Sequence, residues 1–182
     1  LHYFRTAFEA SLAAGNYGYA AYAHCVLVRH QVLSGVNLEK IASETNTNMA
    51  IQYSIKNHGT AQLGIVVNAY VKNLLGLSKT PDSFDNEEFD EAIFLEGFKD
   101  LPIGKVIYEA LKSRMYLYQE EYQKALEHSE KAIPVLMALF GAEWNWFHNN
   151  NYSLALCGVL IQNPKHAKRK EYLEIIDTNQ KQ

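Results

Sequence analysis

The sequence has few residues that interrupt helices or cross-link the chain. Only 4 prolines and 10 glycines occur in 182 residues, which favours long helices with short connections. The two cysteines, Cys25 and Cys157, lie far apart in apolar surroundings. That is typical of small core residues rather than of a structural disulfide. We therefore expect a reducing compartment, the cytoplasm.

Neither sign of charge dominates the chain. The net charge is −3, so the strong positive field that binds nucleic acid or an anionic membrane is missing, and we expect neither partner. No stretch approaches the roughly 20 consecutive apolar residues of a membrane span, and no signal-peptide pattern opens the chain. The hydrophobic content of 48% suits a packed domain. We predict a single domain over 1–182, cut from a longer protein.

One short pattern occurs twice. Tyr17 precedes Ala20, and Tyr122 precedes Ala125, each time just after a short polar turn. An aromatic ring three positions before a small residue suits the second helix of a hairpin, because the ring fills the gap between helices and the small residue admits a partner backbone. The two tyrosines are 105 residues apart, close to three tetratricopeptide periods of about 34. The pattern predicts a helical repeat whose middle units are degenerate.

Apolar residues recur at helical spacing along the whole chain, and no convincing alternating strand interrupts them. We expect a kink or break at 43–48, a bend at Pro134, and a capping box from Asp85 and Glu88 at the start of the fifth helix. The fold class predicted is all-α, an irregular tetratricopeptide-like superhelix of about nine helices in antiparallel hairpins. The expected helices cover residues 2–14, 17–34, 38–57, 60–75, 86–98, 103–118, 121–140, 143–161 and 165–178.

Three segments resemble one known family. They are residues 2–23, residues 74–91 with LLGL followed by PDSFDNEEFDE, and residues 118–126 with YQEEYQKAL. This wording resembles the tetratricopeptide-like region of large bacterial multi-sensor hybrid serine/threonine–histidine kinases. In that family the region follows a predicted ATPase module and precedes a GAF sensor and a histidine kinase. The resemblance implies a place in a signalling protein. It supplies no catalytic residue, because the phosphate-binding and catalytic motifs of the parent are not in this chain.

Two segments invite a ligand-binding interpretation that their spacing does not support. Residues 97–105 end in Gly-Lys, but the glycine spacing of a phosphate loop is wrong and Val106 replaces the hydroxyl residue that binds magnesium. The acidic run 82–91 lacks the alternating oxygen ligands and the sixth-position glycine of a calcium loop. We interpret the first as a helix–helix turn and the second as an acidic helix start. Weak docking of a neighbouring domain on the acidic run stays open.

Histidines and basic residues give weaker signals still. His24 and His30 lie six residues apart on one predicted helix, so they do not share a face, and zinc needs three or four converging ligands. We expect no metal site and no cofactor. The basic run 165–170 has no interleaved aromatic residues, so a solvated face or linker is favoured over nucleic-acid contact.

The densest aromatic cluster is the best candidate site. It occupies the start of the eighth predicted helix and consists of Trp144, Trp146, Phe147, His148 and Tyr152. Core packing between the last hairpins explains it most simply. The alternative is a groove for a ligand or partner, since aromatic residues are good anchors.

The sequence thus predicts a module that binds rather than reacts. The first hypothesis is a non-catalytic helical scaffold in a multidomain signalling kinase, which links ATPase and sensor modules and contacts neighbouring domains or another protein. The second is a sensor domain that binds a small effector in a helical groove and regulates the neighbouring ATPase. A pocket with converging polar groups would favour the second. An enzyme is not expected, because no nucleophile–base pair or carboxylate pair occurs at telling spacing.

Overall fold

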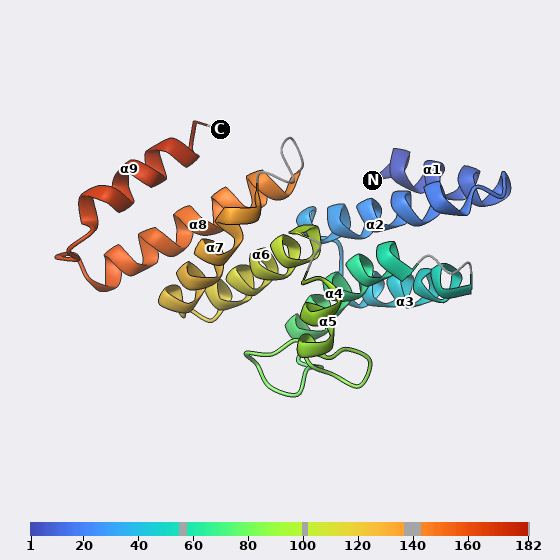
Figure 1. Ribbon diagram of the computed structural model, residues 1–182, viewed down its shortest axis with the longest axis horizontal. Coiled ribbons are helices and arrows are strands. Elements are labelled where there is room, and N and C mark those ends of the chain that lie inside the picture. Colours follow the sequence, from blue (N-terminus) through green and yellow to red (C-terminus); the bar gives the residue numbers. More distant parts are fainter. Residues whose placement is uncertain (55–57, 100–101, 137–142, 182) are drawn as a thin grey trace. The chain divides into compact units, whose positions relative to one another are not determined.

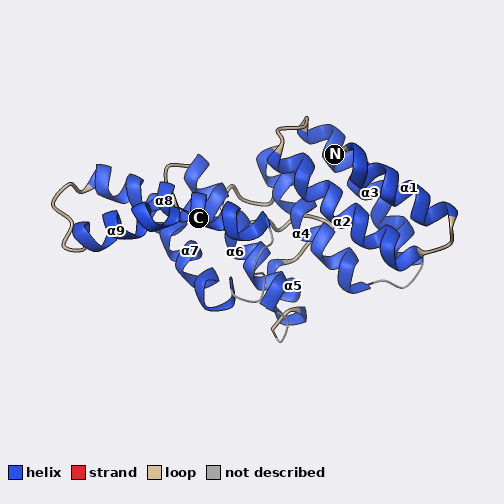
Figure 2. Cartoon of the chain, turned by 90° about the horizontal axis from the view of Figure 1, so that it is seen from above, coloured by secondary structure: helices blue, strands red, loops and turns tan. Residues whose placement is uncertain are grey.

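The computed structural model describes residues 1–54, 58–99, 102–136 and 143–181. Throughout these ranges the chain forms helices and loops, with no strand (Figure 2). The all-α class predicted from the sequence is therefore confirmed. In the described ranges the helices are α1 His2–Ala13, α2 Tyr17–Leu33, α3 Leu38–Ser54, α4 His58–Leu74, α5 Glu91–Gly97, α6 Pro102–Tyr118, α7 Tyr122–Leu136, α8 Glu143–Gln162 and α9 Arg169–Asn179.

The helices fall into two compact units. The first unit is Leu1–Phe94 and the second is Leu95–Gln182, so the boundary lies within α5. Each unit contains one cysteine: Cys25 is buried in the first, Cys157 is partly buried in the second, and both are thiols. That 1–182 behaves as a single domain stays a prediction.

In the first unit, α1 and α2 run antiparallel, as do α3 and α4 (Figure 1). Helix α2 packs against α1, α3 and α4, and this central position explains why most of its residues from Ala20 to Gln31 are buried. Six of its ten buried residues are alanine, cysteine or valine, and these small side chains allow its neighbours to approach closely. Ile41, Val66 and Val71 from the surrounding helices complete the core.

The turn between α1 and α2 follows the Schellman pattern. Gly15 has a φ of +68°. Its N–H donates to the carbonyl of Leu12, and the N–H of Asn16 donates to the carbonyl of Ser11. These bonds satisfy carbonyls that the end of a helix leaves without partners. The side chain of Asn16 then accepts a bond from the N–H of Tyr19 and caps α2.

The same turn recurs between α6 and α7 in the second unit. The N–H of Glu120 donates to Leu117, and the N–H of Glu121 donates to Tyr116. Glu120 occupies the same position in this turn as Gly15 does in the first one, and its φ is +59°. It is the one non-glycine residue with a positive φ among those described. The pattern that occurs twice in the sequence therefore marks the same backbone turn twice.

The tyrosines after the two turns differ in their surroundings. The ring of Tyr122 lies so close to α8 that a Cβ added at Gly158 would overlap with it, so this ring fills an interhelical gap as expected. Tyr17 is about half exposed, and the expectation that its ring fills such a gap is wrong. Ala20 and Ala125 are both buried as expected.

In the second unit, α6, α7 and α8 pack on one another, and α9 packs on α8. Two serines from neighbouring helices, Ser113 and Ser129, share a buried hydrogen bond of 2.8 Å. Pro134 lies inside α7, as expected. The predicted end of this helix at 140 lies outside the described residues.

Three details of the predicted elements are wrong. Helix α3 is continuous through 43–48, so no break occurs there. Helix α5 begins at Glu91 and not at residue 86. The side chain of Asp90, directly before the helix, accepts the N–H of Ile93 and caps it. Asp85, six residues before Glu91 in the chain, accepts the N–H of Glu91 across the loop. Helix α9 begins at Arg169 rather than at 165, because turn-type hydrogen bonds precede it.

Candidate functional site

Four of the five aromatic-cluster residues are buried between helices. Trp144 and Phe147 meet edge-to-face with ring centroids 5.5 Å apart, and the rings of His148 and Tyr152 lie 5.7 Å apart. Trp146 is 62% exposed. The structure thus brings four of these side chains into the packed layer and leaves the fifth on the surface.

One member of the cluster, His148, contacts the neighbouring helix α7 through a polar atom. His148 Nε2 lies 2.8 Å from the carbonyl oxygen of Ser129. Burial lowers the pKa of His148, although the bonds to Ser129 and Asn149 act in the opposite direction. The guanidinium of Arg114 lies over the ring of Phe147 and donates to the side chain of Asn151 at 2.6 Å. Such contacts are those of interhelical packing, and neither pocket described below is lined by the five residues.

The carboxylates of the acidic run 82–91 serve the loop itself. Asp85 accepts the N–H of Glu91 at 2.8 Å, and Glu91 accepts the N–H of Phe84 at 2.9 Å. Asp90 caps α5. Within the described ranges no group of three or more His, Cys, Asp or Glu residues is placed to hold a metal ion.

The histidines and basic residues occupy separate environments. His24 lies beside Phe8, and His30 Nδ1 lies 3.0 Å from the carbonyl oxygen of Val26. In the basic run 165–170, Lys168 and Lys170 lie near carboxylates one turn on in α9. At the supposed phosphate loop, Gly104 packs against the ring of Phe98. Residues 100–101 lie outside the described residues.

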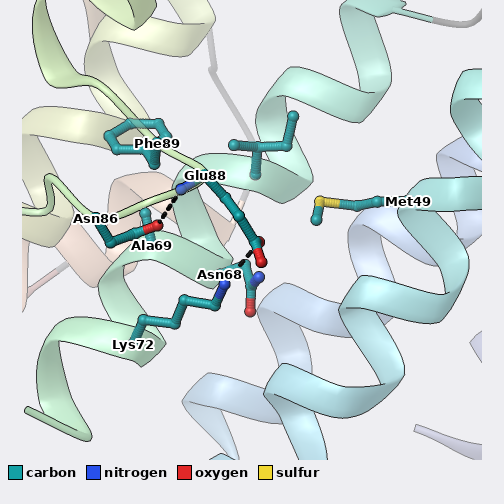
Figure 3. Close-up of a pocket in the computed structure, with 8 residues that line it drawn as sticks. Met49, Asn68, Ala69, Lys72, Asn86, Glu88 and Phe89 are labelled. Atoms are coloured by element: carbon teal, nitrogen blue, oxygen red, sulfur yellow. Dashed lines mark hydrogen bonds and ion pairs between the residues drawn. The ribbon is translucent and has the colours of Figure 1, made fainter. Parts of the chain in front are cut away.

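The site that sequence reasoning missed is a pocket in the first unit. It has a volume of about 200 Å³ and lies between α3, α4 and the loop 75–90 (Figure 3). A second, more open hollow of about 400 Å³ shares part of its wall and extends along the acidic loop. The lining of the first pocket comprises Met49, Ile65, Asn68, Ala69, Lys72, Asn86, Glu88 and Phe89.

Helix α4 supplies one wall by its periodicity. Ile65, Asn68, Ala69 and Lys72 are spaced i, i+3, i+4 and i+7, so they lie on one face. Periodicity in the sequence predicts this helix but assigns no role to the face that lines the pocket. The signal for it is the polar pair Asn68 and Lys72, which share a helix face with Ile65 and Ala69.

The loop that supplies the opposite wall is held by its own hydrogen bonds. The side-chain amide of Asn73 donates to the carbonyls of Pro81 and Ser83, at 3.0 and 2.8 Å. Asn86 accepts the N–H of Glu88 at 2.9 Å and donates to the carbonyl of Phe84 at 3.0 Å. These bonds fix the backbone from which Glu88 reaches toward α4.

An ion pair joins the two walls. Lys72 Nζ lies 2.6 Å from Glu88 Oε2, as the dashed line in Figure 3 shows. The side chain of Lys72 is only 14% exposed, whereas that of Glu88 is largely exposed. Lys72 therefore places a largely covered cation at the pocket and shares it with a carboxylate on the solvent side.

Asn68 adds a polar group that its surroundings only half satisfy. The residue is 3% exposed. Its amide nitrogen donates to the side-chain oxygen of Asn46 at 2.8 Å, but its own oxygen, Oδ1, has no hydrogen-bond partner. A buried acceptor without a donor costs about 1–3 kcal/mol, and this oxygen is covered by the protein rather than open to the pocket.

The function of the site is interpreted from its geometry. Among the described residues, none of the helices combines the length and apolarity needed to cross a bilayer. Comparison of the chain with protein-family models, with curated proteins and with solved structures finds no match.

Proposed function

We propose that the chain is a non-catalytic helical interaction module. The observation that supports this most directly is that short turns join antiparallel helices in both units, at Gly15 and at Glu120, with the same helix-ending hydrogen bonds that occur at Gly35 and Gly76. Modules built from repeated hairpins present extended helical surfaces to partners. Binding to a partner requires such a surface and does not require reactive side chains.

Exposed tyrosines at the start of α2 offer a contact surface. Tyr19 and Tyr22 are 70% and 63% exposed and lie one turn apart, on one face of the helix. Tyrosine is enriched in protein interfaces because its ring provides large contact area while its hydroxyl stays hydrated. Helix α2 is otherwise buried along most of its length, so the packing of the first unit holds this surface in place.

We further propose that the module belongs to a cytoplasmic multidomain signalling kinase. Support comes from the resemblance carried by residues 2–23, 74–91 and 118–126. In such a protein the module would link ATPase and sensor domains and act by position. Its partners would be neighbouring domains or another protein, and not nucleic acid, for which a net charge of −3 is unfavourable.

The test compares partner capture by matched variants. The tagged chain, the double variant Tyr19→Ser/Tyr22→Ser and the control Tyr118→Ser are used to enrich proteins from the source cell under identical conditions. All three positions are exposed, so folding is expected to be unchanged. A partner retained by the control but lost by the double variant supports the proposal. Equal capture by all three contradicts the tyrosine surface, and turnover by the chain alone contradicts a non-catalytic role.

A second candidate function is effector sensing, which the pocket beside Lys72 favours. It brings a covered cation, a carboxylate and a buried amide together with apolar walls, the arrangement expected of a small-molecule site. A ligand that binds the folded state raises the melting temperature by mass action. A thermal-shift screen of metabolites, repeated on Lys72→Met, tests this function, and a shift that survives the substitution contradicts it.

A further inference from the structure

We propose that the pocket between α3, α4 and the loop 75–90 binds a small zwitterion, an α-amino acid with an apolar side chain. This inference rests on the effector-sensing function and names its ligand class. Two features carry it: the Lys72–Glu88 ion pair, which joins the two walls of the pocket, and the apolar remainder of the lining.

Lys72 and Glu88 each keep hydrogen-bonding capacity for one charged group of a ligand. The ammonium of Lys72 has three donors and makes one hydrogen bond in the described structure, to Glu88 Oε2. Glu88 accepts that bond through one of its two oxygens. A ligand carboxylate would accept from Lys72, and a ligand ammonium would donate to Glu88. Because charge-assisted hydrogen bonds are roughly twice as strong as neutral ones, both ends of a zwitterion gain.

The ion pair disfavours ligands that carry a single charge. A purely anionic ligand would meet the Glu88 carboxylate, and a purely cationic one would meet the Lys72 ammonium. A zwitterion offers each of the two groups a charge of the opposite sign.

The rest of the wall defines the ligand body. Met49, Ile65, Ala69 and Phe89 are apolar and come from α3, α4 and the loop; Figure 3 shows Met49 across the pocket from Lys72. Methionine adapts to ligands of different shape. A volume of about 200 Å³ is smaller than the roughly 300–1,000 Å³ of sites for drug-sized molecules. It therefore suits one aliphatic amino acid rather than a nucleotide.

The experiment tests the two charged groups of the ligand separately, with the full chain. Calorimetry and thermal shift are measured with L-leucine, with 4-methylpentanoate, which lacks the amino group, and with 3-methylbutylamine, which lacks the carboxylate. L-Leucine is expected to bind, and each analogue to bind about tenfold more weakly or worse, because a charged group of the site is then left without its partner. Glycine, which has no apolar body, is expected to bind more weakly than leucine.

Variants assign each end of the ligand to its residue. Lys72→Met should abolish the preference for leucine over the amine, and Glu88→Gln should reduce the preference for leucine over the carboxylate. Lys99→Met, an exposed lysine of the second unit, is the matched control and should change nothing. Circular dichroism verifies that each variant is folded.

The outcomes separate this inference from the functions it builds on. Equal binding of leucine and either analogue overturns the zwitterion, as does binding that Lys72→Met leaves intact. If another metabolite class binds and Lys72→Met removes it, effector sensing stands and the ligand class is wrong. If no small molecule binds, water alone fills the pocket and both fail, while partner capture by the tyrosine surface is decided by its own measurement.

Discussion

At the scale of single residues, His24 links the core of the first unit to pH. It is almost fully buried, and burial lowers its pKa from 6.5 to about 4, with the nearby Glu44 carboxylate opposing the shift and Arg5 adding to it. The imidazole is therefore neutral in the folded chain at neutral pH. Glu44 in turn keeps a pKa below its usual value: burial would raise it, but hydrogen bonds from Gln31 and Arg5 outweigh that effect.

The His24 shift predicts acid sensitivity with a definite sign. Below pH 6.5 the unfolded chain takes up a proton at this residue, whereas the folded chain does so only near pH 4. Stability is therefore fully present above pH 6.5 and falls by about 3 kcal/mol as the pH drops to about 4. Urea unfolding across this range measures the slope, and His24→Leu should flatten it. His148, whose pKa is also lowered, keeps part of the slope, so an unchanged slope in the His24 variant would contradict the assignment.

Glu120 is the residue whose backbone is strained. Its φ of +59° costs a side chain with a Cβ roughly 1 kcal/mol, a cost that glycine avoids. We expect Glu120→Gly to raise the free energy of unfolding by about 0.5–1 kcal/mol and Gly15→Ala to lower it by a similar amount. Chemical denaturation measures both. Gly18→Ala, in a helix with open space around it, is the control and should not destabilise; a destabilised Glu120→Gly variant would contradict the strain.

At the scale of elements, the approach of α7 to α8 depends on one glycine. A methyl group at Gly158 would overlap with the base of the Tyr122 ring, where the side chain has little freedom to move. Gly158→Ala should therefore destabilise the chain by about 1–3 kcal/mol. The double variant Gly158→Ala/Tyr122→Ala should lose less than the sum of its parts, as a double-mutant cycle by denaturation would measure. Additive losses would show that the two residues do not share a contact.

The elements also show what the sequence could predict. Periodicity located most helix starts within one or two residues, because apolar stripes and turn signals such as Asn37, which caps α3, are local. It failed at α5, where Asp85 and Asp90 both carry a capping side chain and only the tertiary course of the loop decides between them. It also missed the pocket, because Lys72 and Glu88 are 16 residues apart and meet only after the loop folds back on α4.

At the scale of the whole molecule, the division into two units predicts unfolding in more than one step. Both tryptophans, Trp144 and Trp146, lie in the second unit, so tryptophan fluorescence reports on Leu95–Gln182 alone, whereas far-ultraviolet circular dichroism reports on all helices. We expect the two denaturation curves not to coincide. Gly158→Ala should move the fluorescence midpoint, and His24→Leu should move only the circular dichroism curve. Coincident curves in every variant would show that the units unfold together.

The positions of the two thiols have a consequence for reactivity. Cys25 is buried beside the central packing of α2, whereas Cys157 on α8 is partly exposed. A thiolate must be reached by solvent to react, so a modifying reagent should alkylate Cys157 first in the native chain. The rate of the slower alkylation of Cys25 would then measure how often the first unit opens transiently, without any label added to the chain.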